Sequence, residues 1–161
     1  PYRIYKLDGV TVAIIGTATH ISTQRQDTLL QVLPMEASLR SVIAEVKDDA
    51  DIVVLLTHIG TPADEKLAQA LPEVDIIFGG HDHRRFAELT YALNTDTIIQ
   101  HSGANGQCVG ELSLIWDGER IVDRKLRVLN IIDNLPESPV VAEVRETHLV
   151  GVRSGTAAQS E

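Results

Sequence analysis

Two short apolar runs, each leading into histidine, constrain the fold of this sequence more than any other feature. Residues 51–58 are almost continuously apolar and end in Thr-His. Residues 75–78 form a second run, which leads into Gly-Gly-His-Asp-His at residues 79–83. Uninterrupted runs of this length are typical of parallel strands that are buried on both faces. The carboxyl ends of these two strands are therefore expected to open onto a site.

Helical signals stand before and between the two runs. Apolar residues recur at helical spacing over residues 35–46 and predict an amphipathic helix. Residues 61–64 read Thr-Pro-Ala-Asp, which predicts a helix with threonine as N-cap, proline at the first helical position and an acid at N3. This second helix is expected to extend to about Leu71. The alternation of strands and helices predicts an α/β fold with right-handed parallel βαβ units.

Antiparallel strands are expected at both ends of this α/β core. Residues 2–6 and 10–15 flank an Asp-Gly turn and predict a hairpin. Beyond Phe86 the pattern indicates antiparallel strands at residues 97–100, 108–116 and 120–132, with Asp117-Gly118 as the turn between the last two. Ser138 and Pro139 predict a short helix to about Thr147, and residues 151–161 are expected to be a linker or tail.

Composition excludes several classes of function. The chain of 161 residues carries 14 Lys and Arg against 23 Asp and Glu, a net charge of −9, so we exclude nucleic-acid polymers as the main partner. A single cysteine excludes an intrachain disulfide framework and a cysteine-based zinc cluster. No apolar run approaches the ~20 residues of a membrane helix, and none is expected to span a membrane.

Three of the six histidines follow the predicted parallel strands: His58, His81 and His83. Ligands bind at the carboxyl edge of open α/β sheets. If the His-Asp-His segment is extended, both imidazoles lie on one side of the backbone and Asp82 points the other way. Neutral imidazole suits Zn, Mn, Fe, Co or Ni, so the three histidines predict a metal site. The alternative is that they are surface histidines without a ligand.

Other polar residues near these segments are weaker candidates. His20 and His101 could lie behind the metal ligands, and Arg84 could contact a phosphate by paired hydrogen bonds. For each of the three, a purely structural or solvated position remains the alternative. The free amides at the start of the helix after Thr61 could favour an anion.

The segments around these histidines resemble two signature blocks of the calcineurin-like metallophosphoesterases, in the branch of 5′-nucleotidases and bifunctional nucleotidase-phosphodiesterases. The first block is residues 53–60 (Val-Val-Leu-Leu-Thr-His-Ile-Gly), and the second is residues 74–83 (Val-Asp-Ile-Ile-Phe-Gly-Gly-His-Asp-His). Residues 8–16 and the glycine-rich residues 99–114 also resemble strand pairs of that family. The similarity covers about residues 2–134.

This resemblance implies an αββα sandwich with two divalent metal ions, such as Mn, Zn or Fe, between its sheets. His58 and His81 would bind one ion and His83 the other. Two such ions polarise a phosphoryl group and supply a hydroxide nucleophile. The implied activity is hydrolysis of nucleotide phosphomonoesters. Alternatives are a phosphodiesterase or sulfur-ester hydrolase of the same superfamily, or a non-catalytic metal-binding or assembly module.

The family's earlier blocks, D-x-H, G-D-x-x and G-N-H, are absent from the sequence. Those blocks supply the catalytic histidine, so no catalytic residue is expected within this chain. We therefore expect residues 1–135 to be the C-terminal half of a catalytic domain. Residues 136–161 would be a connector toward a further domain. The expected partners are the missing N-terminal half and a nucleotide or phosphate ester, and the family suggests the periplasm or cell surface.

Overall fold

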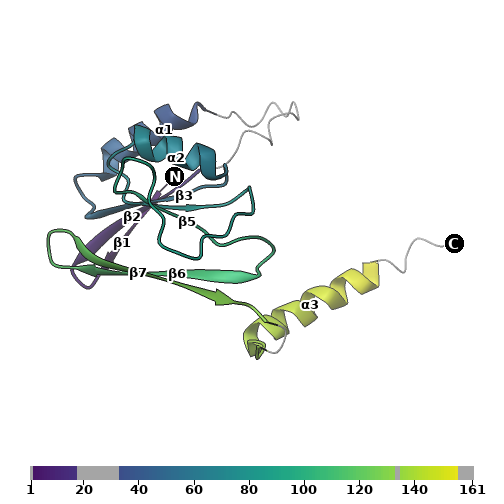
Figure 1. The fold of residues 1–161 in the computed structure, drawn as a ribbon. Helices are drawn as coiled ribbons and strands as arrows, with labels where there is room; N and C mark the ends of the chain where they lie inside the picture. The colour runs from purple at the N-terminus through teal and green to yellow at the C-terminus, as the bar shows by residue number, and fades with distance from the viewer. Residues whose placement is uncertain (1, 18–32, 133–134, 156–161) are drawn as a thin grey trace. The chain divides into compact units, whose positions relative to one another are not determined.

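The computed structural model describes residues 2–17, 33–132 and 135–155 of the chain. The chain divides into two compact units, residues 1–130 and residues 131–161. In the first unit, helices lie on one face of a sheet and a long hairpin lies on the other (Figure 1). None of the helices in the described ranges combines the length and apolar character that crossing a membrane requires.

A five-stranded mixed sheet forms the centre of the first unit, in the order β1-β2-β3-β4-β5. The strands are β1 (Tyr2–Leu7), β2 (Val10–Gly16), β3 (Ile52–Leu56), β4 (Ile76–Gly79) and β5 (Ile98–His101). β1 and β2 form the predicted antiparallel hairpin, whereas β2 to β5 run parallel to one another. The carboxyl ends of β3 and β4 therefore lie at the same edge of the sheet.

Two helices cover one face of this sheet (Figure 1). They are α1 (Met35–Val46) and α2 (Thr61–Ala70), close to the ranges that the sequence predicts. Each helix buries one apolar stripe against alternate strand residues, as amphipathic helices do. The core on this side includes Ala13, Ile15, Leu39, Ile43, Val46, Val53, Leu55, Leu67, Ala68, Leu71, Val74 and Ile77. The resulting layers confirm the predicted α/β class.

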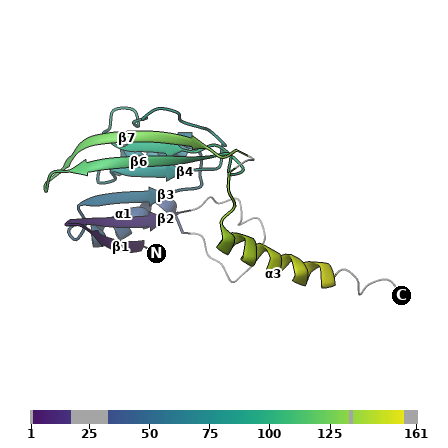
Figure 2. The same cartoon turned by 90° about the horizontal axis from the view of Figure 1, so that it is seen from below.

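The strands β6 (Cys108–Trp116) and β7 (Ile121–Asn130) form an antiparallel hairpin on the opposite face of the sheet. Leu112, Leu114 and Trp116 pack against the sheet, while the residues between them are exposed. This alternation is typical of strands with one covered face. In Figure 2 the hairpin lies over β4, and β1 lies at the far edge of the sheet. All six residues of β1 are exposed, so neither face of this edge strand is buried.

The prediction of antiparallel pairing for residues 97–100 is wrong. β5 runs parallel to β4, with Ile76 opposite Ile98 and Gly79 opposite His101. A parallel neighbour needs a crossover connection, usually a helix. Residues 80–97 make this crossover without a regular helix, so the sequence carries no periodic signal for it.

The prediction of Thr61 as an N-cap is also wrong. Gly60 occupies the cap position with a φ of +87°, and Thr61 is the first helical residue. A positive φ of this size favours glycine, so the cap is set by backbone conformation. No side chain makes a capping hydrogen bond there.

The second unit contains α3 (Pro139–Gly155). The helix begins where Ser138 and Pro139 predict a start, but it continues well past Thr147. The predicted tail is therefore helical up to Gly155, and its remaining residues lie outside the described part of the chain.

Candidate functional site

His58 and His81 meet at the carboxyl edge of the sheet. His58 lies just beyond β3 and His81 just beyond β4, which are adjacent parallel strands. The two loops are tied together because the Gly60 N–H donates to the Gly80 carbonyl at 2.9 Å. The ring centroids are 5.3 Å apart, with an angle of 75° between the ring planes. Both histidines are exposed, so their ring nitrogens are available to a ligand.

The backbone around His83 differs from the extended segment that the sequence suggests. His81 has a φ of +95° and His83 a φ of +58°. Residues other than glycine rarely adopt such φ values, and each residue held there costs on the order of 1–3 kcal/mol of conformational free energy. Among the described residues, no three His, Cys, Asp or Glu side chains form a group that could hold a metal ion. The structure therefore brings His58 and His81 together without joining His83 to them.

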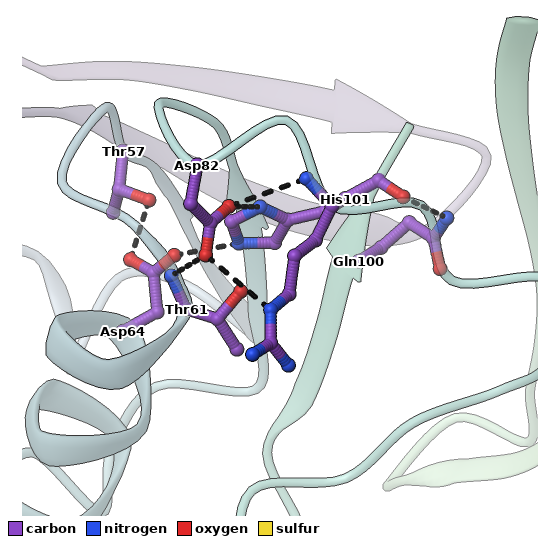
Figure 3. A network of polar contacts seen from close by, with 7 residues as sticks. Thr57, Thr61, Asp64, Asp82, Gln100 and His101 are labelled. Carbon is purple, nitrogen blue, oxygen red and sulfur yellow. Dashed lines mark hydrogen bonds and ion pairs between the residues drawn. The ribbon is translucent and has the colours of Figure 1, made fainter. Parts of the chain in front are cut away.

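The Asp82 carboxylate points toward Thr61 and His101 (Figure 3). Its Oδ2 accepts the Thr61 N–H at 2.8 Å, and its Oδ1 accepts the Arg84 N–H at 3.4 Å. Burial alone would raise the pKa of Asp82. Hydrogen bonds from Thr61 and Arg84, together with nearby His101, instead lower this pKa to about 2. The first amide of α2, predicted to favour an external anion, therefore binds an internal carboxylate.

A buried polar group lies behind this loop (Figure 3). Nε2 of His101, at the end of β5, is 2.7 Å from Oδ2 of Asp64, and the side chains are 1% and 0% exposed. The Thr57 hydroxyl donates to the other oxygen of Asp64 at 2.6 Å. Nδ1 of His101 lies 3.3 Å from Oδ1 of Asp82. The His101 ring is thus placed between two carboxylates.

Gly79 ends β4 directly against this buried pair. A Cβ at this position would overlap Nε2 of His101 and Oδ2 of Asp64. Glycine is required here because of this close approach. The glycine thus makes room for the buried histidine.

The sequence pattern predicts Asp64 only as an acid in the first turn of the helix and not as a site residue. A signal for its burial was nevertheless present. Asp64, Leu67, Ala68 and Leu71 share the spacing of one helix face, so Asp64 occupies the apolar stripe of α2. An acid in such a stripe indicates a buried polar partner, and here that partner is His101.

The weaker candidates take different positions. His101 is buried behind the loop, and its role behind the metal ligands stays a prediction. Arg84 is 61% exposed, and its Nε lies 3.8 Å from Oδ2 of Asp82. His20 lies outside the described residues, so its predicted place near the site stays a prediction.

The donors at this edge fit part of a metal site. Imidazole nitrogens are ligands for several divalent ions, and the rings of His58 and His81 lie with their centroids 5.3 Å apart. The neighbouring carboxylates of Asp64 and Asp82 are occupied by hydrogen bonds. A complete ligand shell therefore needs donors beyond this pair.

Three curated proteins are similar to the chain, and no family model matches it. The uncharacterized metallophosphoesterase YunD of Bacillus subtilis is 36% identical over 84 residues, which cover 52% of this chain and 18% of YunD. The trifunctional nucleotide phosphoesterase protein YfkN of the same species is 25% identical over 147 residues, covering 86% of this chain and 10% of YfkN. A 5′-nucleotidase of Vibrio cholerae is 30% identical over 99 residues, which cover 50% of this chain and 18% of that nucleotidase. The chain spans less than a fifth of each relative.

Solved structures share the fold. The sulfate thiohydrolase SoxB of Thermus thermophilus matches with a TM-score of 0.81 and 22% identity, covering 95% of this chain and 29% of SoxB. The calcineurin-like phosphoesterase YfkN of Bacillus subtilis matches with a TM-score of 0.74 and 21% identity, covering 96% of this chain and 58% of the other. Together with the sequence relatives, these structures confirm the resemblance to metallophosphoesterases of the 5′-nucleotidase branch.

Proposed function

We propose that this chain is the C-terminal half of the catalytic domain of a metal-dependent phosphoesterase that hydrolyses nucleotide phosphomonoesters. The observation that carries the proposal is the meeting of His58 and His81 at the ends of adjacent parallel strands. This is the edge at which open α/β sheets bind ligands. Residues 1–135 would belong to the catalytic domain, and residues 136–161 would connect it to a further domain.

His58 and His81 would hold one divalent ion, and His83 would hold a second one. When both ions are bound, they polarise the phosphoryl group and activate water. The chain itself presents imidazole nitrogens at an exposed edge and fixes the two loops through the Gly60–Gly80 hydrogen bond. The exposed guanidinium of Arg84 lies on the same loop as His81 and His83 and could contact the phosphate.

Catalytic proton transfer is assigned to residues outside this chain. Neither Asp64 nor His101 is placed to carry it, because both side chains are buried and paired with each other. In the proposal, the D-x-H, G-D-x-x and G-N-H blocks lie on another stretch of polypeptide. They would complete both ligand shells. The 161-residue chain alone is accordingly expected to bind metal weakly and to hydrolyse little.

The names of two relatives support a nucleotide substrate: a trifunctional nucleotide phosphoesterase and a 5′-nucleotidase. A periplasmic or cell-surface location follows from the family resemblance alone. The alternatives are hydrolysis of phosphodiesters or sulfur esters by the same ions, and a module that binds metal without catalysis.

The test is a phosphate-release assay on the protein encoded by the complete reading frame, with 5′-AMP and Mn²⁺. His81→Ala should lower kcat/KM by at least about 100-fold, whereas His148→Ala, which removes an exposed histidine of α3, should leave it unchanged. Full activity in His81→Ala would overturn the ligand assignment. Hydrolysis of bis(p-nitrophenyl) phosphate or a thiosulfate ester without 5′-AMP hydrolysis would favour the other hydrolases. Metal binding without any hydrolysis would favour the non-catalytic module.

A further inference from the structure

We propose that His101 and Asp82 form a brace that sets the geometry of the His81–His83 loop for metal binding, with Asp64 anchoring His101 from behind. The inference rests on the proposed function. It deepens that proposal by assigning a positioning role to residues that are not metal ligands.

The first argument is the burial of the anchor. Asp64 and His101 are 0% and 1% exposed, and they join α2 to β5 through a polar contact of 2.7 Å. Burying such groups is unfavourable unless they are fully partnered. Apolar residues of similar volume often stabilise a core equally well or better. Core filling alone therefore gives no reason for a histidine and an acid here.

The second argument is the direction of the His101 ring. Nε2 is held by Asp64, so the orientation of the ring is fixed from the interior. Nδ1 is buried and makes no hydrogen bond within the described part of the chain. It lies 3.3 Å from Oδ1 of Asp82. The ring thus directs its remaining nitrogen at the residue between the two candidate ligands.

The third argument is the backbone of the loop. His81 and His83 have left-handed φ values, which persist only where the surroundings enforce them. Asp82 supplies that enforcement because its carboxylate accepts hydrogen bonds from the Thr61 amide of α2 and the Arg84 amide of the loop, and it lies 3.3 Å from Nδ1 of His101 at the end of β5.

Loss of the brace would let the loop relax and move the His81 ring away from His58. The two rings now lie at a centroid distance of 5.3 Å, and a shared ion depends on that proximity. Outer partners that orient metal ligands typically change metal affinity by about 10–100-fold. The brace is expected to act in this range.

The experiment is a calorimetric and spectroscopic titration with Co²⁺ of the protein from the complete reading frame. Asp82→Ala and His101→Gln should weaken Co²⁺ binding by about 10–100-fold and change the intensity of the Co²⁺ d–d bands. Asp82→Asn should restore much of the affinity, because its amide oxygen can still accept the Thr61 N–H. His81→Ala removes a ligand and His148→Ala is the matched neutral control.

Each outcome decides a different point. Wild-type affinity and spectrum in both Asp82→Ala and His101→Gln, with loss of binding in His81→Ala, would overturn the brace and leave the metal site standing. Wild-type binding in His81→Ala would overturn the site, and the brace with it. A purely structural role would lower the melting temperature without altering the spectrum, which also counts against the brace. If His101→Gln does not fold, the Asp82 variants decide alone, since they lie on an exposed loop.

Discussion

Oδ2 of Asp64 and Nε2 of His101 meet at 2.7 Å in the interior, joining the first turn of α2 to the end of β5. The other oxygen of Asp64 accepts the hydroxyl of Thr57, which follows β3. One carboxylate therefore ties three elements together, directly beneath the edge where His58 and His81 emerge.

Asp64→Ala should reduce the free energy of unfolding by about 2–6 kcal/mol. The substitution leaves the Thr57 hydroxyl and the His101 ring buried without their partner, at about 1–3 kcal/mol each. Urea denaturation followed by circular dichroism measures the change. Glu65→Ala, at the exposed neighbouring position, should stay within about 0.5 kcal/mol. Equal losses in the two variants would contradict the assigned role of the pair.

Gly79→Ala should destabilise the chain by at least about 1–3 kcal/mol, the usual effect of overpacking. The added methyl group would overlap the buried Asp64–His101 pair. Gly16→Ala is the matched control, because Gly16 also ends a strand but no atom of the described residues lies within 4 Å of the added carbon. Thermal denaturation should separate the two variants, and similar melting temperatures would refute the close-packing argument.

Leu114→Ala should lower the free energy of unfolding by about 1–3 kcal/mol. Ile115→Ala should leave it nearly unchanged. Leu114 packs against the sheet, and its neighbour Ile115 is 57% exposed on the other face of the hairpin. Truncating a partly buried leucine loses transfer energy and leaves a gap. Urea denaturation of both variants tests which face of β6 is covered. A larger loss in Ile115→Ala would reverse the assigned faces.

The pH dependence of stability should have opposite signs at Asp75 and Asp117. Burial raises the pKa of Asp75 above 3.8. The hydrogen bond from the Val53 amide and the charge of Arg124 lower this pKa, but burial has the larger effect. Its contribution to stability is therefore present below pH 3.8 and is lost as the pH rises through the folded-state pKa. Backbone hydrogen bonds from Arg120 and Glu119 lower the pKa of Asp117, so its contribution is present above pH 3.8 and is lost on acidification.

Urea titrations at pH 3, 5 and 7 check this prediction. Relative to the wild type, Asp75→Asn should gain stability as the pH rises, and Asp117→Asn should lose it. Parallel curves for the two variants would show that one of the assigned pKa directions is wrong.

Periodicity and strand-end chemistry predict most of this fold. The helix at residues 35–46 and the β1–β2 hairpin are found as expected, because each depends on local spacing and a recognisable turn. The direction of β5 could not be predicted. Its crossover has no helix, and antiparallel and parallel neighbours have similar local patterns.

The sequence likewise predicts one part of the candidate site and not the other. Strand ends predict that His58 and His81 converge, and the structure places their rings side by side. The pairing of Asp64 with His101 joins positions 37 residues apart, and only the tertiary fold brings them together. A positive φ is uncommon for any residue other than glycine, so no local rule indicates the left-handed backbone at His81.

The positive φ values of His81 and His83 lower the stability of the fold at the two positions whose imidazoles the proposed chemistry needs. Glycine adopts positive φ without strain, so His81→Gly or His83→Gly would relieve on the order of 1–3 kcal/mol while removing an imidazole. Directed evolution for thermal tolerance alone would therefore enrich glycine at the two positions that the proposed chemistry needs most. Any library built on this chain should hold residues 81 and 83 constant and seek its stabilising substitutions elsewhere.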